Sequence, residues 1–396
     1  MVKPGSVVRL SPWRRTALYP FRWTALVLLI MIPARSGFAL PALVPPLVRQ
    51  QCPVMGLQEG GERGFSASGI ILTAFDWRAT WHFDVASGRR FPIPETAPCG
   101  RNCRLSPDGT ELSYFNDATN AHNIMRLDGA NRVFVATNAI DVQWWDEYTL
   151  FAWTPGVSAF ILRNGEQESF DADNLISVQP GGAWGLRVDF DGERFNRSLV
   201  DLRSDSEDIL ELGEDIPYYN NFAWSPDRRM LAFVQPIPIS EGVYASELFL
   251  LDLETLALHQ ATQLQIAYGV TRINGIAVND LAWSPDSRRL AFWVTPDSAA
   301  GDSPAEVQAV VHLLDARTDE LTAYCGFSTT THTPNPPHLV WSPEGDALAF
   351  ADDIVDDGRG AFLIGLSVES GRYAILSEGI YAAYGSPDVY LWGSKP

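Results

Sequence analysis

The sequence predicts an all-β protein, namely a single β-propeller of four-stranded antiparallel blades, with seven blades expected and six or eight as the alternatives. A phrase built on Ser-Pro-Asp recurs along the chain, and no helical periodicity of useful length appears after residue 40. A second hairpin recurs about 10 to 20 residues after the phrase, as expected for strand-rich repeats that close into a ring of small sheets.

The first 39 residues have the pattern of a secretory signal peptide. Five Lys and Arg residues between positions 3 and 22 precede an apolar run over 23–32, and small residues at Gly37 and Ala39 suit cleavage after position 39. The run is about half of the ~20 residues that a spanning helix needs. We therefore expect a cleaved signal, with an uncleaved N-terminal anchor as the alternative, and a location in the periplasm or at the cell surface.

Charge and composition exclude several functions for the rest of the chain. Residues 40–55 are expected to be an extended, Pro-rich lead-in outside the packed domain, and residues 56–396 the propeller. The formal charge is −19, and removal of the leader takes away six cations and no acids, giving −25. Such a balance excludes sequence-independent binding to nucleic acid and direct binding to anionic lipids beyond an N-terminal anchor.

The four cysteines predict a disulfide framework. Outside the cytoplasm an even count favours disulfides, and four cysteines allow three connectivities. The expected arrangement pairs Cys99 with Cys103 locally and Cys52 with Cys325 over a long loop. Zinc binding is the alternative, but the sequence lacks a second closely spaced Cys/His pair.

The recurring phrase is interpreted as a strand, a tight turn and a second strand. Proline fixes φ at the first turn position and aspartate accepts hydrogen bonds from the following amides. Its four clear copies are Ser106-Pro107-Asp108, Trp224-Ser225-Pro226-Asp227, Trp283-Ser284-Pro285-Asp286 and Trp341-Ser342-Pro343. Because every copy carries the serine, we expect turn formers rather than nucleophiles, and the repeated tryptophans are expected in the core. A fifth copy at Ser386 is expected to complete a terminal blade with N-terminal strands.

This phrase resembles the repeat signature of TolB-like, WD40-like β-propellers, which are common in exported bacterial proteins. Degenerate copies extend the resemblance over roughly Gly56 to Trp392. The resemblance implies the propeller fold and a platform for protein contacts.

Strand order predicts which face of the propeller binds. The turns between strands 1 and 2 and between strands 3 and 4 are short, whereas the 2–3 loops, such as 235–246, and the blade-to-blade crossings are long. Binding residues usually lie on such loops. The candidate contacts there are Tyr218, Tyr219, Tyr244, Asp352, Asp353, Asp356 and Asp357.

Each candidate has an alternative interpretation. Exposed tyrosines suit protein or sugar contacts, but they also pack against their own loops. The acidic loop offers oxygen ligands to Ca²⁺, yet its spacing does not match an EF-hand, so we expect solvated charge and no cofactor.

The predicted function is that of an exported, non-catalytic propeller that serves as a protein–protein interaction platform at the cell envelope. Neither a Gly-x-Ser-x-Gly elbow nor a His-Glu-x-x-His motif occurs in the sequence. Two alternatives stay open. One is a propeller that binds a glycan or small ligand, and the other is a glycosidase- or lyase-type enzyme with a site over the central channel, whose carboxylates the sequence does not single out.

Overall fold

The structure is a computed structural model. It describes residues 48–55, 67–93, 96–99, 103–116, 118–137, 139, 141–154, 157–162, 166–170, 174–203, 207–215, 222–273, 281–296, 308–330, 338–352, 361–381 and 389–395. The predicted signal segment and the first half of the lead-in, residues 40–47, lie outside these residues. Within the described part of the chain, no helix has the length and apolar character needed to cross a membrane.

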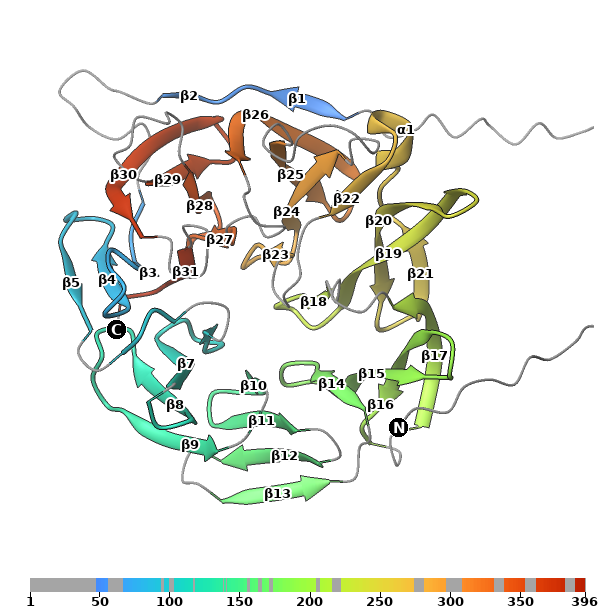
Figure 1. Cartoon of the computed structure of the whole chain (residues 1–396), viewed down its shortest axis with the longest axis horizontal. Helices are drawn as coiled ribbons and strands as arrows, with labels where there is room; N and C mark the ends of the chain where they lie inside the picture. Colours follow the sequence, from blue (N-terminus) through green and yellow to red (C-terminus); the bar gives the residue numbers. More distant parts are fainter. Residues whose placement is uncertain are drawn as a thin grey trace, which may run out of the picture. The chain divides into compact units, whose positions relative to one another are not determined.

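Seven antiparallel sheets form a ring, which confirms the predicted seven-bladed propeller (Figure 1). Blade 2 consists of β6 (Arg104–Leu105), β7 (Glu111–Asn116), β8 (Ala121–Arg126) and β9 (Val133–Thr137). Blade 3 consists of β10 (Asp141–Trp144), β11 (Thr149–Thr154), β12 (Val157–Leu162) and β13 (Gln167–Phe170). Blade 4 consists of β14 (Leu175–Val178), β15 (Trp184–Phe190), β16 (Phe195–Asp201) and β17 (Glu207–Asp215).

The later blades follow the same meander. Blade 5 consists of β18 (Phe222–Trp224), β19 (Met230–Ser240), β20 (Val243–Asp252) and β21 (Ala257–Gln260). Blade 6 consists of β23 (Ala282–Trp283), β24 (Arg289–Pro296), β25 (Gln308–Asp315) and β26 (Glu320–Thr330). Blade 7 consists of β27 (Val340–Trp341), β28 (Ala347–Asp352), β29 (Ala361–Ser367) and β30 (Arg372–Ile380).

Blade 1 closes the ring from both ends of the chain. Its innermost strand is β31 (Val389–Gly393), followed by β3 (Ile70–Thr73), β4 (Trp81–Asp84) and β5 (Arg90–Pro92). The prediction that the C-terminal repeat completes a blade with N-terminal strands is therefore confirmed. At the junction, the indole of Trp392 donates to the carbonyl of Ser68 at 2.7 Å, and the Ser394 amide donates to the carbonyl of Gly109 at 2.9 Å.

Part of the lead-in packs against the propeller, which differs from the prediction. Strand β1 (Arg49–Gln51) pairs in parallel with β26, and β2 (Val54–Met55) pairs in parallel with β30. A disulfide between Cys52 and Cys325 fixes the segment between these two short strands. The segment is extended, as predicted, but it adds an outer strand to blades 6 and 7 and covers their open edges.

The core lies between neighbouring blades because the inner strands pack on both faces. In β19, Leu231 and Phe233 join a cluster shared with blade 4, while Ala232 between them joins a cluster shared with blade 6. All three residues are fully buried. In the repeated Leu-Ala-Phe phrase, the large side chains thus pack on one face of the strand and the small side chain packs on the other.

Two further elements differ from the predicted loops. The crossing after blade 5 contains a five-residue helix, α1 (Leu264–Tyr268), and a strand, β22 (Thr271–Ile273), that pairs with the end of β24. The segment predicted as a long 2–3 loop, 235–246, instead continues β19 and β20 as a hairpin.

Candidate functional site

The two faces of the ring are defined by its connections. We call the face with the 1–2 and 3–4 turns the turn face, and the face with the 2–3 connections and the blade crossings the loop face. The predicted binding residues belong to the loop face, whereas the Ser-Pro-Asp turns belong to the turn face.

The serines of the turn face stabilise the turns, as predicted. Ser225 donates its hydroxyl to the Asp227 carboxylate at 2.6 Å and accepts from the Met230 amide at 2.9 Å. The copies at Ser106 and Ser284 make the same two bonds, and Ser342 reaches Asp346 in place of the glutamate of its turn. The hydroxyls are therefore engaged in turn geometry.

The repeated tryptophans connect neighbouring blades. Trp283 donates its indole N–H to the carbonyl of Ala223 in the preceding blade at 3.0 Å, and Trp341 donates to that of Ala282 at 2.8 Å. Trp144 donates to the carbonyl of Arg104, and Trp224 to the hydroxyl of Ser177, each in the preceding blade. Trp392 donates to the carbonyl of Ser68 within blade 1, where the two ends of the chain meet. Trp283 and Trp341 are buried and Trp224 is half-buried. These contacts are those of residues that pack between blades.

A cavity of about 590 Å³ lies among these first strands on the turn face. The tryptophans and the turn prolines Pro107, Pro226, Pro285 and Pro343 contribute to its wall. Its size lies within the range of small-molecule sites. The indole N–H groups that reach its wall already donate within the protein, which leaves a mainly apolar surface.

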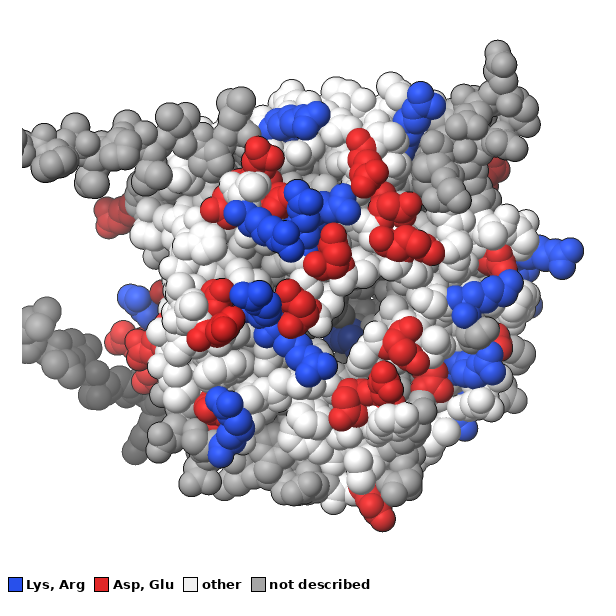
Figure 2. Space-filling view, turned by 180° about the vertical axis from the view of Figure 1, so that it is seen from behind, with Lys and Arg blue, Asp and Glu red and all other residues white. Residues whose placement is uncertain are grey.

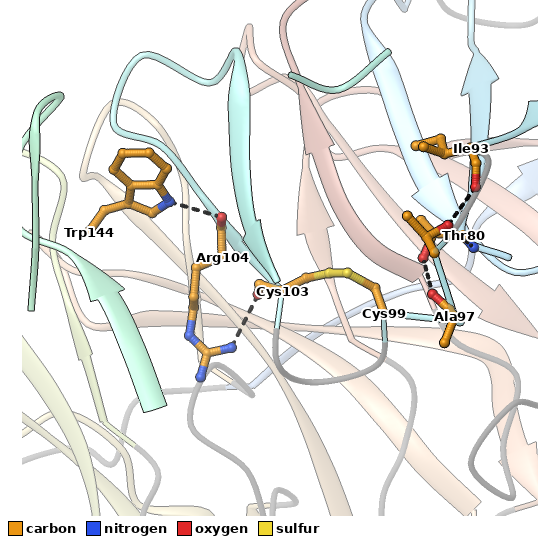
Figure 3. Close-up of a disulfide and its surroundings, with 8 residues drawn as sticks. Thr80, Ile93, Ala97, Cys99, Cys103, Arg104 and Trp144 are labelled. Carbon is orange, nitrogen blue, oxygen red and sulfur yellow. Dashed lines mark hydrogen bonds between the residues drawn. A yellow bond between two sulfur atoms is a disulfide. The ribbon is translucent and has the colours of Figure 1, made fainter. Parts of the chain in front are cut away.

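A disulfide borders this cavity. Cys99 and Cys103 are bonded, as predicted, and Cys103 contributes to the cavity wall (Figure 3). Next to it, the carbonyl of Arg104 accepts from the indole of Trp144 at 3.1 Å, while the Arg104 guanidinium donates to the carbonyl of Cys103 at 3.1 Å. The disulfide thus anchors the entry into β6, the innermost strand of blade 2.

Exposed apolar side chains occur on both faces. Those on the hairpins and crossings of the loop face are Trp77, Phe190, Ile239, Val243, Tyr244, Ile266 and Tyr381. Those at the turns of the turn face or directly next to them, among the described residues, include Phe91, Val133, Tyr148, Leu162 and Leu258. Such side chains on rigid elements mark contact surfaces for other proteins.

The predicted contact residues are distributed unevenly. Tyr244 is 55% exposed near the tip of the β19–β20 hairpin. Asp352 is only 2% exposed, because β28 extends to that residue and pairs it with Phe362. Tyr218, Tyr219, Asp353, Asp356 and Asp357 lie outside the described residues.

Two exposed aromatic residues were not predicted. Trp77 is 66% exposed in the 2–3 connection of blade 1, and Phe190 is 58% exposed at the tip of the β15–β16 hairpin. Phe190 contacts Phe195 across the turn, with ring centroids 4.8 Å apart. An aromatic residue directly before the polar turn 191–194 is the sequence signal that could have identified it.

Acidic residues at the same hairpin serve its turn. The Asp191 carboxylate accepts from the backbone N–H groups of Arg194 and Glu193 and from the side chain of Asn196. These hydrogen bonds, led by that from Arg194, lower the pKa of Asp191. The described contacts of Asp191 are thus those of a turn.

Charge on the ring is mixed. Figure 2 shows Asp and Glu interspersed with Lys and Arg around a central hollow on the face turned to the viewer. Nucleic-acid binding needs a basic face, and the described surface in this view has none of that kind. Among the residues that the structure describes, no group of three or more His, Cys, Asp or Glu side chains is placed to bind a metal ion.

Four histidines are buried: His82, His122, His312 and His338. His312 lies in β25, where its Nδ1 contacts the carbonyl of Val310 at 2.9 Å and its Nε2 contacts the hydroxyl of Tyr268 at 3.0 Å. Burial lowers the pKa of His312 to about 4 and also lowers that of His82. Burial thus favours the neutral form of both imidazoles.

The comparisons with known proteins identify the fold. No protein-family profile and no curated protein matches the chain. A TolB structure from Acinetobacter baumannii is 14% identical over 89% of each chain, with a TM-score of 0.46. An oligogalacturonate lyase solved with manganese is 15% identical over 81% of this chain and 90% of that chain, with a TM-score of 0.50.

A second oligogalacturonate lyase, from Vibrio parahaemolyticus, is 12% identical over the same shares, also with a TM-score of 0.50. The likeness to the two lyase structures agrees with the β-propeller fold that the seven sheets show directly.

Proposed function

We propose that this protein is an exported, non-catalytic β-propeller that binds a protein partner through its loop face. The observation that carries the proposal is the set of exposed aromatic side chains on three separate 2–3 connections, at Trp77, Phe190 and Tyr244. Aromatic residues are enriched in protein interfaces relative to the rest of a protein surface.

Export is supported by two independent features. The N-terminal residues have the charge and apolar pattern of a signal peptide, and all four cysteines are paired in disulfides. N-terminal sequencing of the protein recovered from its source cells tests this part. A mature chain that begins at Leu40 supports the export proposal, whereas an intact Met1 in the cytoplasmic fraction contradicts it.

The binding face is tested by site-specific photocrosslinking in the source cells. A photoreactive phenylalanine analogue replaces Phe190 or Tyr244 on the loop face, and Tyr148 on the turn face serves as the matched control because it is 62% exposed. We expect one protein adduct shared by positions 190 and 244 and absent at 148. Adducts at 148 alone would assign binding to the turn face, and no adduct at any position would argue against a protein platform.

A second candidate function rests on the cavity of about 590 Å³ on the turn face. Its tryptophan- and proline-rich wall suits a glycan or another small ligand. A thermal-shift screen against a glycan panel tests this alternative. A ligand that raises the Tm, and no longer does so in Pro226→Trp, which reduces the cavity, would favour ligand binding over the protein platform.

A further inference from the structure

One hairpin of the loop face projects beyond its blade. Within blade 5, β18 pairs with Leu231–Phe233 and β21 pairs with Phe249–Asp252. The remaining parts of the two central strands pair only with each other, from Gln235–Glu247 outward to Ser240–Val243. We call this two-stranded projection, residues 235–247, the finger; it extends from the ring between β19 and β20 in Figure 1.

The finger is apolar at its outer end. Ile239 is 43% exposed, Val243 36% and Tyr244 55%, and Pro238 beside them is exposed as well. Its only charged group beyond the root is Glu241 at the turn. Apolar side chains exposed to water lower the free energy of the protein when another surface covers them.

The root of the finger is held by two buried charged side chains. Arg197, 1% exposed in the neighbouring β16, donates to the carbonyl of Val234 at 3.3 Å. Glu247, fully buried, accepts from the Thr262 hydroxyl at 2.6 Å and from the Leu264 and Gln265 amides at 2.9 Å. An isolated hairpin is marginal in water, so these contacts supply the order that the finger needs.

Two prolines limit how the finger can bind. Pro236 and Pro238 lie in β19 and have no backbone N–H to donate. A proline-containing edge cannot form a complete ladder with an added strand. The finger therefore offers its side chains, rather than this edge, to a partner.

The exposed charge of the finger itself is acidic. Glu241 lies at its turn, whereas Glu247 is buried at its root. Beside the root, β17 contributes the exposed Glu211, and Glu214, which pairs with Arg194 at 3.3 Å. A partner surface with Lys or Arg around its contact site would be attracted here, whereas an acidic surface or an anionic membrane would be repelled.

We infer that the finger is the contact element for a basic protein partner, which receives Ile239 and Tyr244 in an apolar socket flanked by Lys and Arg. This inference rests on the proposed function and specifies the chemistry of the partner. The apolar contact provides the anchor, and the acidic surroundings select the partner and orient its approach.

The test uses two labelled peptides and the mature chain. Both have the apolar centre Val-Leu-Trp-Val; one is flanked by Lys-Arg and Arg-Lys, the other by Glu-Asp and Asp-Glu. Fluorescence anisotropy should show at least tenfold tighter binding of the basic peptide, weakened several-fold between 0.05 and 0.5 M NaCl because salt screens the attraction. Tyr244→Ser should weaken this binding at least tenfold and Glu241→Lys several-fold, while Tyr148→Ser leaves it unchanged.

Three results would overturn the inference. These are equal binding of the two peptides, an equal effect of Tyr148→Ser and Tyr244→Ser, and Tyr244-dependent sedimentation with anionic vesicles instead of peptide binding. Photocrosslinking distinguishes a wrong inference about the basic partner from a wrong proposal that the protein binds a protein partner at all. If position 244 still captures one protein while the peptides do not differ, the platform stands and the basic partner does not. Unchanged Tm values show that the variants are folded.

Discussion

Removal of the long disulfide should destabilise the protein more than removal of the short one. Cys52–Cys325 closes a loop with a sequence separation of 273, whereas Cys99–Cys103 spans a separation of 4. The chain-entropy relation then gives about 5 to 6 kcal/mol for the long loop and about 2 kcal/mol for the short one. Because Cys99 and Cys103 are buried, replacing them by alanine adds on the order of 1 kcal/mol from lost packing.

These energies convert to melting temperatures. With about 350 ordered residues, the entropy of unfolding is about 0.7 kcal/mol per kelvin, so we expect Tm to fall by about 7 to 8 °C for the long disulfide and about 4 °C for the short one. The assay is scanning calorimetry without reductant on the double variants Cys52→Ala/Cys325→Ala and Cys99→Ala/Cys103→Ala. Equal shifts, or a larger shift for the short disulfide, would refute the argument from loop length.

Three further predictions concern the core, the pH dependence and the closure of the ring. Trp283→Phe removes an inter-blade hydrogen bond and should cost about 1 to 2 kcal/mol, seen as a lower urea midpoint at unchanged m-value; an unchanged midpoint would contradict a linking role. The pKa of His312 is lowered from 6.5 to about 4 in the folded state, so the unfolded chain binds the proton more readily and stability, full above about pH 6.5, should fall by up to about 3 kcal/mol toward pH 4. In urea titrations across this range, His312→Asn should remove most of the loss, and an unchanged pH dependence in this variant would contradict the prediction. Gly69→Ala, at φ +91° with an added Cβ 2.5 Å from a carbonyl of β31, should lower Tm more than Gly242→Ala, at φ +73° with open space around it.

The repeat made most of the ring predictable from sequence. Trp283 and Ser284 belong to a local phrase whose turn chemistry is independent of the rest of the chain, so their roles followed from spacing alone. The same phrase at the C-terminus predicted the closure through β31. A short sequence phrase that is repeated in every blade can predict the whole ring, because each blade contacts only its neighbours.

Features that depend on distant pairing were not predictable in this way. Pro236 and Pro238 are residues typical of loops. The finger is nevertheless a hairpin, because each of its strands pairs with the other alone and the prolines need no N–H toward a further strand. Asp352 looks like part of an acidic loop, but its pairing with Phe362 extends β28 and buries it. The parallel strands β1 and β2 pair with residues near the other end of the chain, which sequence periodicity does not reveal.

Closure through β31 fixes the order in which this chain can fold. Strands β3 to β5 come early in the sequence, but the innermost strand of their blade is Val389–Gly393. The inner edge of blade 1 therefore stays unpaired until the strands of the other blades have been made. During that interval the edge is open to pairing with other chains. Truncation that removes β31 should consequently damage blade 1, at the opposite end of the sequence, first.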